Sequence, residues 1–198
     1  LNETPSNISL SSSSFNENIE SGSTVTELSS SDPDSSDTHT YSLVSGSGDT
    51  NNNSFTIDGS SLKIKASPDY ETQSSYNIHL QTTDSSGETY AKAFTLSVNG
   101  LNESPSNISL SSSSFNENID AASVVATLSS TDEDAGDTHT YSLISGIGDT
   151  DNNSFTIDGS NLIINSSPDY ESKSSYSIRL QTTDSGDESY METIIVNV

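Results

Sequence analysis

The residues best suited to chemistry in this sequence are carboxylates, which gather in four short clusters instead of being spread along the chain. Carboxylates this close together repel one another, and a divalent cation between them turns that repulsion into attraction. Alternate acids in a kinked loop can both reach one ion. The clusters are Glu17; Asp32, Asp34 and Asp37; Asp69 and Glu71; and Asp84.

Every cluster returns 100 positions later, in the same order. Asn2 and Glu3, which precede the first set, likewise return as Asn102 and Glu103. A scattering of surface acids that only promotes solubility would not repeat in this way. The second set is Glu117; Asp132, Asp134 and Asp137; Asp169 and Glu171; and Asp184.

The donor types favour calcium as the metal. Calcium takes about six to eight oxygen ligands from carboxylates, amides and backbone carbonyls. No single cluster supplies that many, so a complete site must combine several clusters. The chain has no cysteine, and its histidines are not paired as zinc ligands require.

The acid clusters are part of a wider internal duplication. Leu1–Leu10 returns almost unchanged as Leu101–Leu110, and about two-thirds of the aligned positions are identical without any insertion. A repeat of this length has the size of a domain. We therefore expect two tandem domains, residues 1–100 and 101–198.

Within each repeat the apolar pattern is that of short strands. Tyr76, Ile78 and Leu80 alternate with polar residues, and glycine-rich turns separate the runs. About seven short strands in about 100 residues predict an all-β fold, with one immunoglobulin-like β-sandwich per repeat. The expected strands are residues 7–10, 15–19, 25–30, 38–44, 55–58, 61–64, 76–83 and 90–98.

Taken in order, these elements resemble those of the cadherins. Glu17 matches the early Glu of that family, Asp32-x-Asp34 its Asp-x-Asp element, and Asp84 its later Asp. Pro68-Asp69-Tyr70-Glu71 resembles the family's Leu-Asp-Arg-Glu element. The whole of each repeat is most similar to the Asp-Tyr-Glu type of cadherin-like repeat in large bacterial surface adhesins.

The resemblance implies calcium sites between consecutive repeats. Gly100 stands where the family has its first linker Asp, and the linker is one residue shorter before Pro105, so one ion of the usual set is expected to be weak or absent. The implied junction ligands are Glu17, Asp69 and Glu71, then Asn102 and Glu103, then Asp132, Asp134 and Asp184. Half-sites are implied by Asn2, Glu3, Asp32, Asp34 and Asp84 at one end and by Glu117, Asp169 and Glu171 at the other.

Other side chains have simpler interpretations. His39 and His139 are expected to face solvent or a cross-strand neighbour. Most of the repeated tyrosines are expected to pack in or beside the core, with a sugar-stacking surface as the alternative. Asp149 and Asp151 are weaker metal candidates, because only the first recurs (as Asp49) and Asn51 replaces the second, so they are expected to shape a turn.

Composition excludes several classes of function and partner. Asp and Glu outnumber Lys and Arg by 29 to 5, and the formal net charge is −24, which disfavours nucleic acid and anionic membranes as partners. No apolar run reaches the roughly 20 residues that span a bilayer. No nucleophile or catalytic cleft is indicated, so we expect no enzyme.

We expect an extracellular, cell-surface spacer that calcium makes rigid. The alternatives are calcium-dependent binding of polysaccharide and homophilic adhesion.

Overall fold

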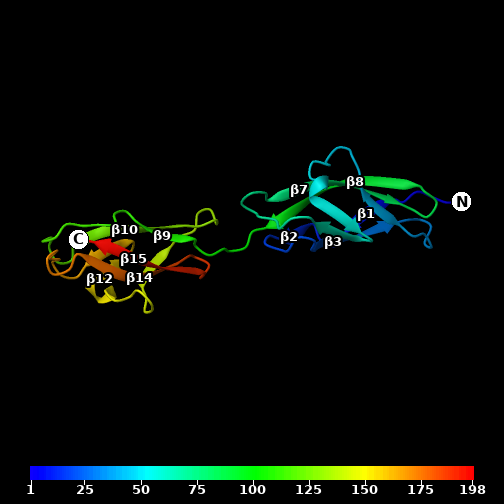
Figure 1. The fold of residues 1–198 in the computed structure, drawn as a ribbon. Coiled ribbons are helices and arrows are strands. Elements are labelled where there is room, and N and C mark those ends of the chain that lie inside the picture. The colour runs from blue at the N-terminus through cyan, green and yellow to red at the C-terminus, as the bar shows by residue number, and fades with distance from the viewer. The chain divides into compact units, whose positions relative to one another are not determined.

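The structure is a computed structural model that describes residues 1–198. The chain forms two compact units, Leu1–Leu101 and Asn102–Val198, each drawn as a β-sandwich in Figure 1. Both units are built from strands with one short 3₁₀ turn each, so the predicted all-β fold is confirmed. Neither turn is long enough to cross a membrane as a helix.

Unit 1 has two four-stranded sheets. The first has the order β1-β3-β6-β5 and the second β2-β8-β7-β4. Neighbouring strands are antiparallel except β2 and β8, which pair in parallel. The strands are β1 (Asn7–Leu10), β2 (Ser14–Asn16), β3 (Thr24–Ser31), β4 (Thr40–Leu43), β5 (Phe55–Asp58), β6 (Ser61–Ile64), β7 (Ser75–Thr83) and β8 (Thr89–Asn99), with the 3₁₀ turn η1 at Asn52–Ser54.

Unit 2 repeats this arrangement with one strand fewer. Its sheets have the orders β12-β13-β10-β9 and β11-β14-β15. The counterpart of β2 is reduced to a single bridge between Ser114 and Asn197. The strands are β9 (Asn107–Leu110), β10 (Val124–Thr131), β11 (Thr140–Leu143), β12 (Phe155–Asp158), β13 (Asn161–Ile164), β14 (Ser175–Thr183) and β15 (Ser189–Asn197), with η2 at Asn152–Ser154.

The core of each unit lies between its two sheets. Tyr76, Ile78 and Leu80 of β7 are buried, as their alternation predicts. Phe15, Phe55 and Tyr76 form an aromatic group, with ring centroids 5.3 Å apart for Phe55 and Tyr76 and 6.0 Å apart for Phe15 and Tyr76. An edge-to-face pair of this kind, such as Phe55 and Tyr76, gives a chain with few apolar residues more stabilisation than area alone.

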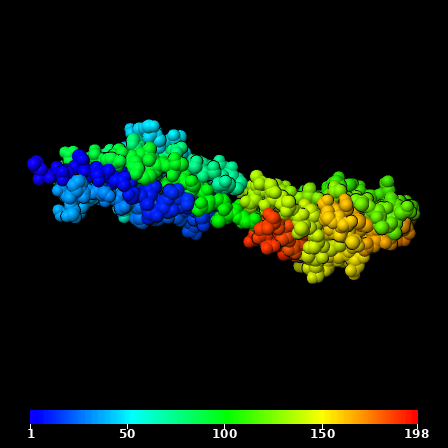
Figure 2. Space-filling model, turned by 180° about the vertical axis from the view of Figure 1, so that it is seen from behind, coloured from blue at the N-terminus to red at the C-terminus, as the bar shows by residue number.

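Two predicted strands end earlier or begin later than expected. The strand expected over residues 15–19 stops at Asn16, because the chain turns at Asn18, which has a left-handed φ of 59°. The strand expected over residues 38–44 begins only at Thr40. In the space-filling view the loop after β4, near residue 50, stands out from the surface of unit 1 (Figure 2).

Candidate metal centre

The acid clusters of each unit lie at the two ends of its longest strand pair, which is β7 and β8 in unit 1 and β14 and β15 in unit 2. In unit 1, β7 runs from Ser75, just after Asp69 and Glu71, to Thr83, just before Asp84. A strand of nine residues spans about 30 Å. Asp84 therefore lies at the opposite end of the unit from Asp69 and Glu71.

We name the two groups by the course of the chain. The entry cluster lies where the chain enters a unit, and the exit cluster lies where it leaves. In unit 1 the entry cluster is Asn2, Glu3, Asp32, Asp34, Asp37 and Asp84, and the exit cluster is Glu17, Asp69 and Glu71. In unit 2 they are Asn102, Glu103, Asp132, Asp134, Asp137 and Asp184, and Glu117, Asp169 and Glu171.

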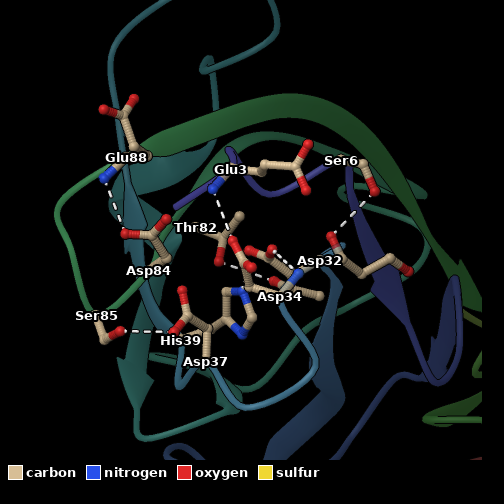
Figure 3. A network of polar contacts seen from close by, with 12 residues as sticks. Glu3, Ser6, Asp32, Asp34, Asp37, His39, Thr82, Asp84, Ser85 and Glu88 are labelled. Atoms are coloured by element: carbon tan, nitrogen blue, oxygen red, sulfur yellow. Dashed lines mark hydrogen bonds and ion pairs between the residues drawn. The ribbon is translucent and has the colours of Figure 1, made fainter. Parts of the chain in front are cut away.

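The entry cluster of unit 1 brings together the ends of β3 and β7 and the loop before β4. Figure 3 shows Asp32, Asp34, Asp37 and Asp84 gathered around one space. One carboxylate oxygen from each of Asp32, Asp37 and Asp84 lies within 4.8 Å of the other two. Asp84 is 6% exposed, so this acid is held away from bulk water.

The first residues of the chain are bonded to this cluster. The Asn2 side chain donates from Nδ2 to Asp84 Oδ2 at 2.9 Å, and the Glu3 N–H donates to Asp34 Oδ2 at 2.7 Å. The Asp34 N–H donates in turn to Asp32 Oδ1 at 2.9 Å. Asn2, Glu3, Asp32, Asp34 and Asp84, predicted to lie together, are therefore in one network.

His39 also belongs to this network, and the prediction that it faces solvent or a cross-strand neighbour is wrong. Its Nε2 lies 3.1 Å from Asp32 Oδ2, and its side chain is 12% exposed. His139 repeats the contact with Asp132 at 3.0 Å. His39, the residue before β4, thus contacts an acid of the entry cluster, and pairing with β7 begins at the next residue, Thr40.

The entry cluster of unit 2 has the same geometry. Asn102 Nδ2 donates to Asp184 Oδ2 at 3.0 Å, and the Glu103 N–H donates to Asp134 Oδ2 at 2.8 Å. Asp132, Asp137 and Asp184 offer oxygens within 4.8 Å of one another. The two units therefore hold the cluster residues in the same way, as expected for repeats with about two-thirds identical positions.

The exit cluster of unit 1 is organised around Glu17, which is 2% exposed. Glu17 Oε2 accepts a hydrogen bond from the Tyr70 N–H, and Oε1 accepts one from the Leu101 N–H, both at 2.6 Å. Glu17, Asp69 and Glu71 offer oxygens within 4.8 Å of one another. The left-handed turn at Asn18 fixes Glu17 in this position.

The exit cluster of unit 2 has the same members in a more open setting. Glu117, Asp169 and Glu171 again lie within 4.8 Å, but all three are exposed. The Tyr170 N–H reaches Glu117 Oε2 at 3.2 Å. In unit 1 the equivalent glutamate also accepts a hydrogen bond from the Leu101 N–H.

Gly100 is explained by packing within unit 1. A Cβ at this position would lie 3.1 Å from Tyr70 Cδ1 and 3.3 Å from its Cγ. The Asp that the cadherin pattern places here would therefore press on the tyrosine ring. The chain departs from the cadherin pattern at two positions that adjoin each other in the fold. Tyr70 replaces the family's Arg, and Gly100 replaces its Asp.

Hydrogen bonds keep several of these acids ionised. The Asn2 amide, with backbone N–H groups of Glu88, Ser86 and Gly87, lowers the pKa of Asp84 below its usual 3.8. The Thr72 hydroxyl lowers the pKa of Asp69, and the Ser172 hydroxyl lowers that of Asp169. At neutral pH these groups are fully charged, which is the form that binds a cation.

The donor set fits calcium. Every side chain that faces the entry cluster offers oxygen, apart from the histidine nitrogen that is already engaged by Asp32. Asp37 Oδ2 and Asp137 Oδ2 are buried and accept no hydrogen bond from the protein. A buried anionic oxygen without a donor is costly unless a cation meets it.

The remaining candidate residues have structural roles or stay untested. Asp49 and Asp149 each accept the N–H of a turn glycine, at 2.9 and 2.8 Å, which confirms the predicted turn role. Tyr76 is buried, whereas Tyr70 is 41% and Tyr170 52% exposed. A sugar could stack on such exposed rings, and carbohydrate binding stays a prediction.

Comparison with known proteins gives one family match. Residues 11–99 match the family model of the cadherin domain. Cadherin domains are non-enzymatic adhesion modules, which confirms the expectation that this chain has no catalytic chemistry. The acidic clusters described above are consistent with calcium binding in such domains.

Solved structures match the chain over its full length. The human Protocadherin-24 EC1-2 structure has a TM-score of 0.73 and 20% identity, with 100% of this chain and 98% of that chain covered. The Protocadherin GammaB4 extracellular domain has a TM-score of 0.64 and 21% identity, and this chain covers 32% of its length. Identities this low establish the fold, and with the family match they show that the chain has the fold of two tandem cadherin domains.

Proposed function

We propose that the two units are a calcium-rigidified spacer in an extracellular adhesion protein of the bacterial surface type. The observation that supports this most is the bonding of three consecutive residues. The Leu101 N–H is bonded to Glu17 in the exit cluster of unit 1, while Asn102 and Glu103 are bonded to Asp184 and Asp134 in the entry cluster of unit 2. The chain thus passes from one acid cluster to the next without an intervening segment.

Calcium would bring these two clusters together and cancel their mutual repulsion. The ligands would be Glu17, Asp69 and Glu71 of unit 1, Asn102 and Glu103 of the linker, and Asp132, Asp134 and Asp184 of unit 2. Several carboxylates at one ion fix the direction in which each unit leaves the linker. The entry cluster of unit 1 and the exit cluster of unit 2 would serve neighbouring repeats in the same way.

The test is the distribution of distances between the units. The chain has no cysteine, so the S47C/S160C variant carries spin labels at two exposed positions, one in each unit. We expect pulsed electron resonance to give a narrow distance distribution in calcium and a broad one in chelator. Glu17→Gln should restore the broad distribution at calcium concentrations that order the parent, whereas the exposed-site control Glu20→Gln should not. Equally broad distributions with and without calcium would refute the spacer mechanism.

A second candidate function, homophilic adhesion, is supported by a difference between the units. Ile147 is 90% exposed, Ile195 52% and Met191 48%. The aligned residues of unit 1 are Ser47, Thr95 and Ala91.

These side chains share one face around a cation. The Arg179 guanidinium donates to the Ile147 carbonyl at 3.2 Å and contacts Met191 Sδ at 3.9 Å. Arg179 pairs with Thr193 across β14 and β15. We propose a second copy of the chain as the partner, because the same apolar face on that copy could cover these side chains. The net charge of −24 per copy opposes this contact, so we expect it only where calcium or salt reduces the repulsion.

Sedimentation velocity in calcium tests this second function. The parent chain should show weak, concentration-dependent dimers. The I147S/M191A/I195T variant, which gives unit 2 the residues of unit 1, should stay monomeric. A parent chain that is monomeric at every concentration, with and without chelator, would exclude homophilic association through this face.

A further inference from the structure

One asparagine in the chain is followed by glycine, and it lies at the end of the last strand of unit 1. Asn99 is the final residue of β8, Gly100 comes next, and both are exposed. A backbone nitrogen can attack the side-chain amide of the asparagine before it. Glycine favours this attack because it has no side chain in the way and the widest choice of backbone conformations. Asn99 is therefore the asparagine whose sequence context is most reactive.

The Gly100 nitrogen is available as the nucleophile. Its N–H lies just beyond β8 and donates no hydrogen bond to the protein. Asn53, which is followed by a small residue too, differs in this respect, because the Ser54 N–H donates to the Asn51 carbonyl at 2.9 Å. A bonded nitrogen must give up its hydrogen bond before it can attack. The structure thus adds to the reactivity that the sequence gives Asn99.

Packing keeps position 100 a glycine. A Cβ there would lie 3.1 Å from Tyr70 Cδ1, closer than the ring can easily accept. A larger residue after Asn99 would slow the attack, but the tyrosine ring leaves no room for one. The reactive pair is therefore built into the contact between Tyr70 and the end of β8.

Glu17 holds the chain on both sides of this pair. Its N–H donates to the Asn99 carbonyl at 3.2 Å, and its Oε1 accepts the Leu101 N–H at 2.6 Å. We call these two hydrogen bonds the Glu17 clamp. Attack requires the Asn99 side chain and the Gly100 nitrogen to rotate toward each other, away from the extended backbone of a strand. Such a rotation needs a local opening of the clamp, so Glu17 controls the reaction.

We propose that Asn99 and Gly100 form a self-modification site, at which Asn99 deamidates at a rate set by the Glu17 clamp. The Gly100 nitrogen forms a bond to Cγ of Asn99, the bond from Cγ to Nδ2 breaks, and ammonia leaves with the proton of the Gly100 N–H. Water then opens the succinimide ring at one of its two carbonyls. One opening gives aspartate, and the other gives isoaspartate, whose main chain runs through the former side chain.

Both products change the exit cluster of unit 1. Each adds one carboxylate beside Glu17, and isoaspartate also adds one carbon to the main chain before Gly100, which shifts the Leu101 N–H away from Oε1. The calcium dependence of the reaction rests on the proposed function. An ion held by Glu17 would keep the clamp closed and slow the attack, so the modified fraction would record how long the chain has been without calcium.

Peptide mapping by mass spectrometry tests the site. The full chain is incubated for weeks at pH 7.4 in water enriched in heavy oxygen, with calcium or with chelator, and ring opening labels each new carboxylate. In chelator we expect Asn99 to react roughly tenfold faster than Asn102, an exposed asparagine that is followed by glutamate. Calcium should slow Asn99 several-fold. The N99Q chain should show no reaction at this position, because a six-membered ring closes far more slowly. Equal rates at Asn99 and Asn102 would overturn the proposal.

Substitutions at Glu17 test the clamp. Glu17→Ala removes the oxygen that accepts the Leu101 N–H, whereas Glu17→Gln keeps an oxygen there. In chelator E17A should react several-fold faster than the parent, and E17Q at close to the parent rate. Glu17→Asp, which withdraws the carboxylate by one carbon and disturbs the buried site less, should also react faster. E20A alters an exposed acid nearby and should match the parent, and backbone hydrogen exchange checks that each variant remains folded.

The outcomes separate this inference from the proposed function. A chain that binds no calcium, but whose Asn99 reacts faster in E17A and E17D, would refute the calcium spacer and support the clamped site. A chain that calcium stiffens, but whose Asn99 reacts at one rate in E17A, E17D and the parent, would overturn the clamp and leave the spacer mechanism intact. A calcium-binding chain whose Asn99 reacts equally fast with and without the ion would overturn the protection by calcium.

Discussion

Residues 51 and 151 fill one structural role with two different side chains. Asn51 Oδ1 accepts the Asn77 N–H at 2.9 Å, and Asp151 Oδ2 accepts the Ser177 N–H at 2.8 Å. Asp151 also pairs with Lys173, whose Nζ lies 2.5 Å from Oδ1. Burial raises the pKa of Asp151, but the hydrogen bonds from Lys173 and Ser177 outweigh it and leave that pKa below 3.8.

This pair should make unit 2 sensitive to acid at one defined position. A carboxyl group with a lowered folded-state pKa stabilises the fold above its unfolded pKa, and this stabilisation disappears as the pH falls through the folded value. The D151N/K173N variant lacks both charges. It should be less stable than the parent by about 0.5 kcal/mol at pH 7, because Lys173 is 42% exposed and the pair is partly screened.

Urea unfolding at pH 7 and at pH 2 checks this, with hydrogen exchange used to follow unit 2. The difference between parent and variant should shrink as the pH falls below about 4. Comparing the two chains removes the effect of the other 28 acidic residues, because the variant loses only Asp151 of the 29. A difference that stays constant or grows in acid would contradict the assignment.

At the residue scale, the sequence identified the acids of the clusters more successfully than it identified the side chains that contact them. The repeat of each cluster at a spacing of 100 was enough to select the residues that the structure brings together. His39 was missed because a lone histidine in Thr-His-Thr has no second ligand nearby in sequence, and its partner Asp32 is seven positions away across a loop. The recurrence of the histidine at position 139 was the available signal.

At the scale of elements, β7 and β8 were the most predictable part of the fold. Long alternation fixes which side chains of β7 are buried, and the strands expected at 7–10, 55–58 and 61–64 match β1, β5 and β6 at both ends. The region after β2 was not predictable in the same way. Apolar residues at 15 and 19 continue a strand pattern, but Asn18 adopts a left-handed turn that directs Glu17 into the exit cluster.

The same elements explain why the clusters lie at the ends of a unit. Each acid follows or precedes a strand, so the strand lengths set the separation between entry and exit clusters. For β7 and β8 the predicted lengths are within two residues of those observed, which is enough to place Asp84 and Asp69 at opposite ends. It does not predict hydrogen bonds such as that of Ser85 to Asp37, because these depend on side-chain conformation in a loop.

At the scale of the whole molecule, the dominant property is a net charge of −24 on 198 residues. Such a charge opposes the compact state through self-repulsion. The core that resists it is small, since Leu, Ile, Val and Phe make up only about a fifth of the chain. Stability without calcium should therefore depend on ionic strength.

We expect the melting temperature in chelator to rise by several degrees between 20 mM and 500 mM sodium chloride, because the screening length falls from roughly 20 Å to about 4 Å over this range. In saturating calcium the closest acids are already neutralised, so the same salt increase should raise the melting temperature much less. Differential scanning calorimetry in both conditions measures the two slopes. Choline chloride serves as the control for specific binding of sodium, since it screens charge but does not enter a small oxygen cluster. A melting temperature in chelator that did not change with either salt would contradict this prediction. Repulsion among the acids would then not limit the stability of the calcium-free chain. Any stabilisation by calcium would have to come from ordering the loops of the entry clusters.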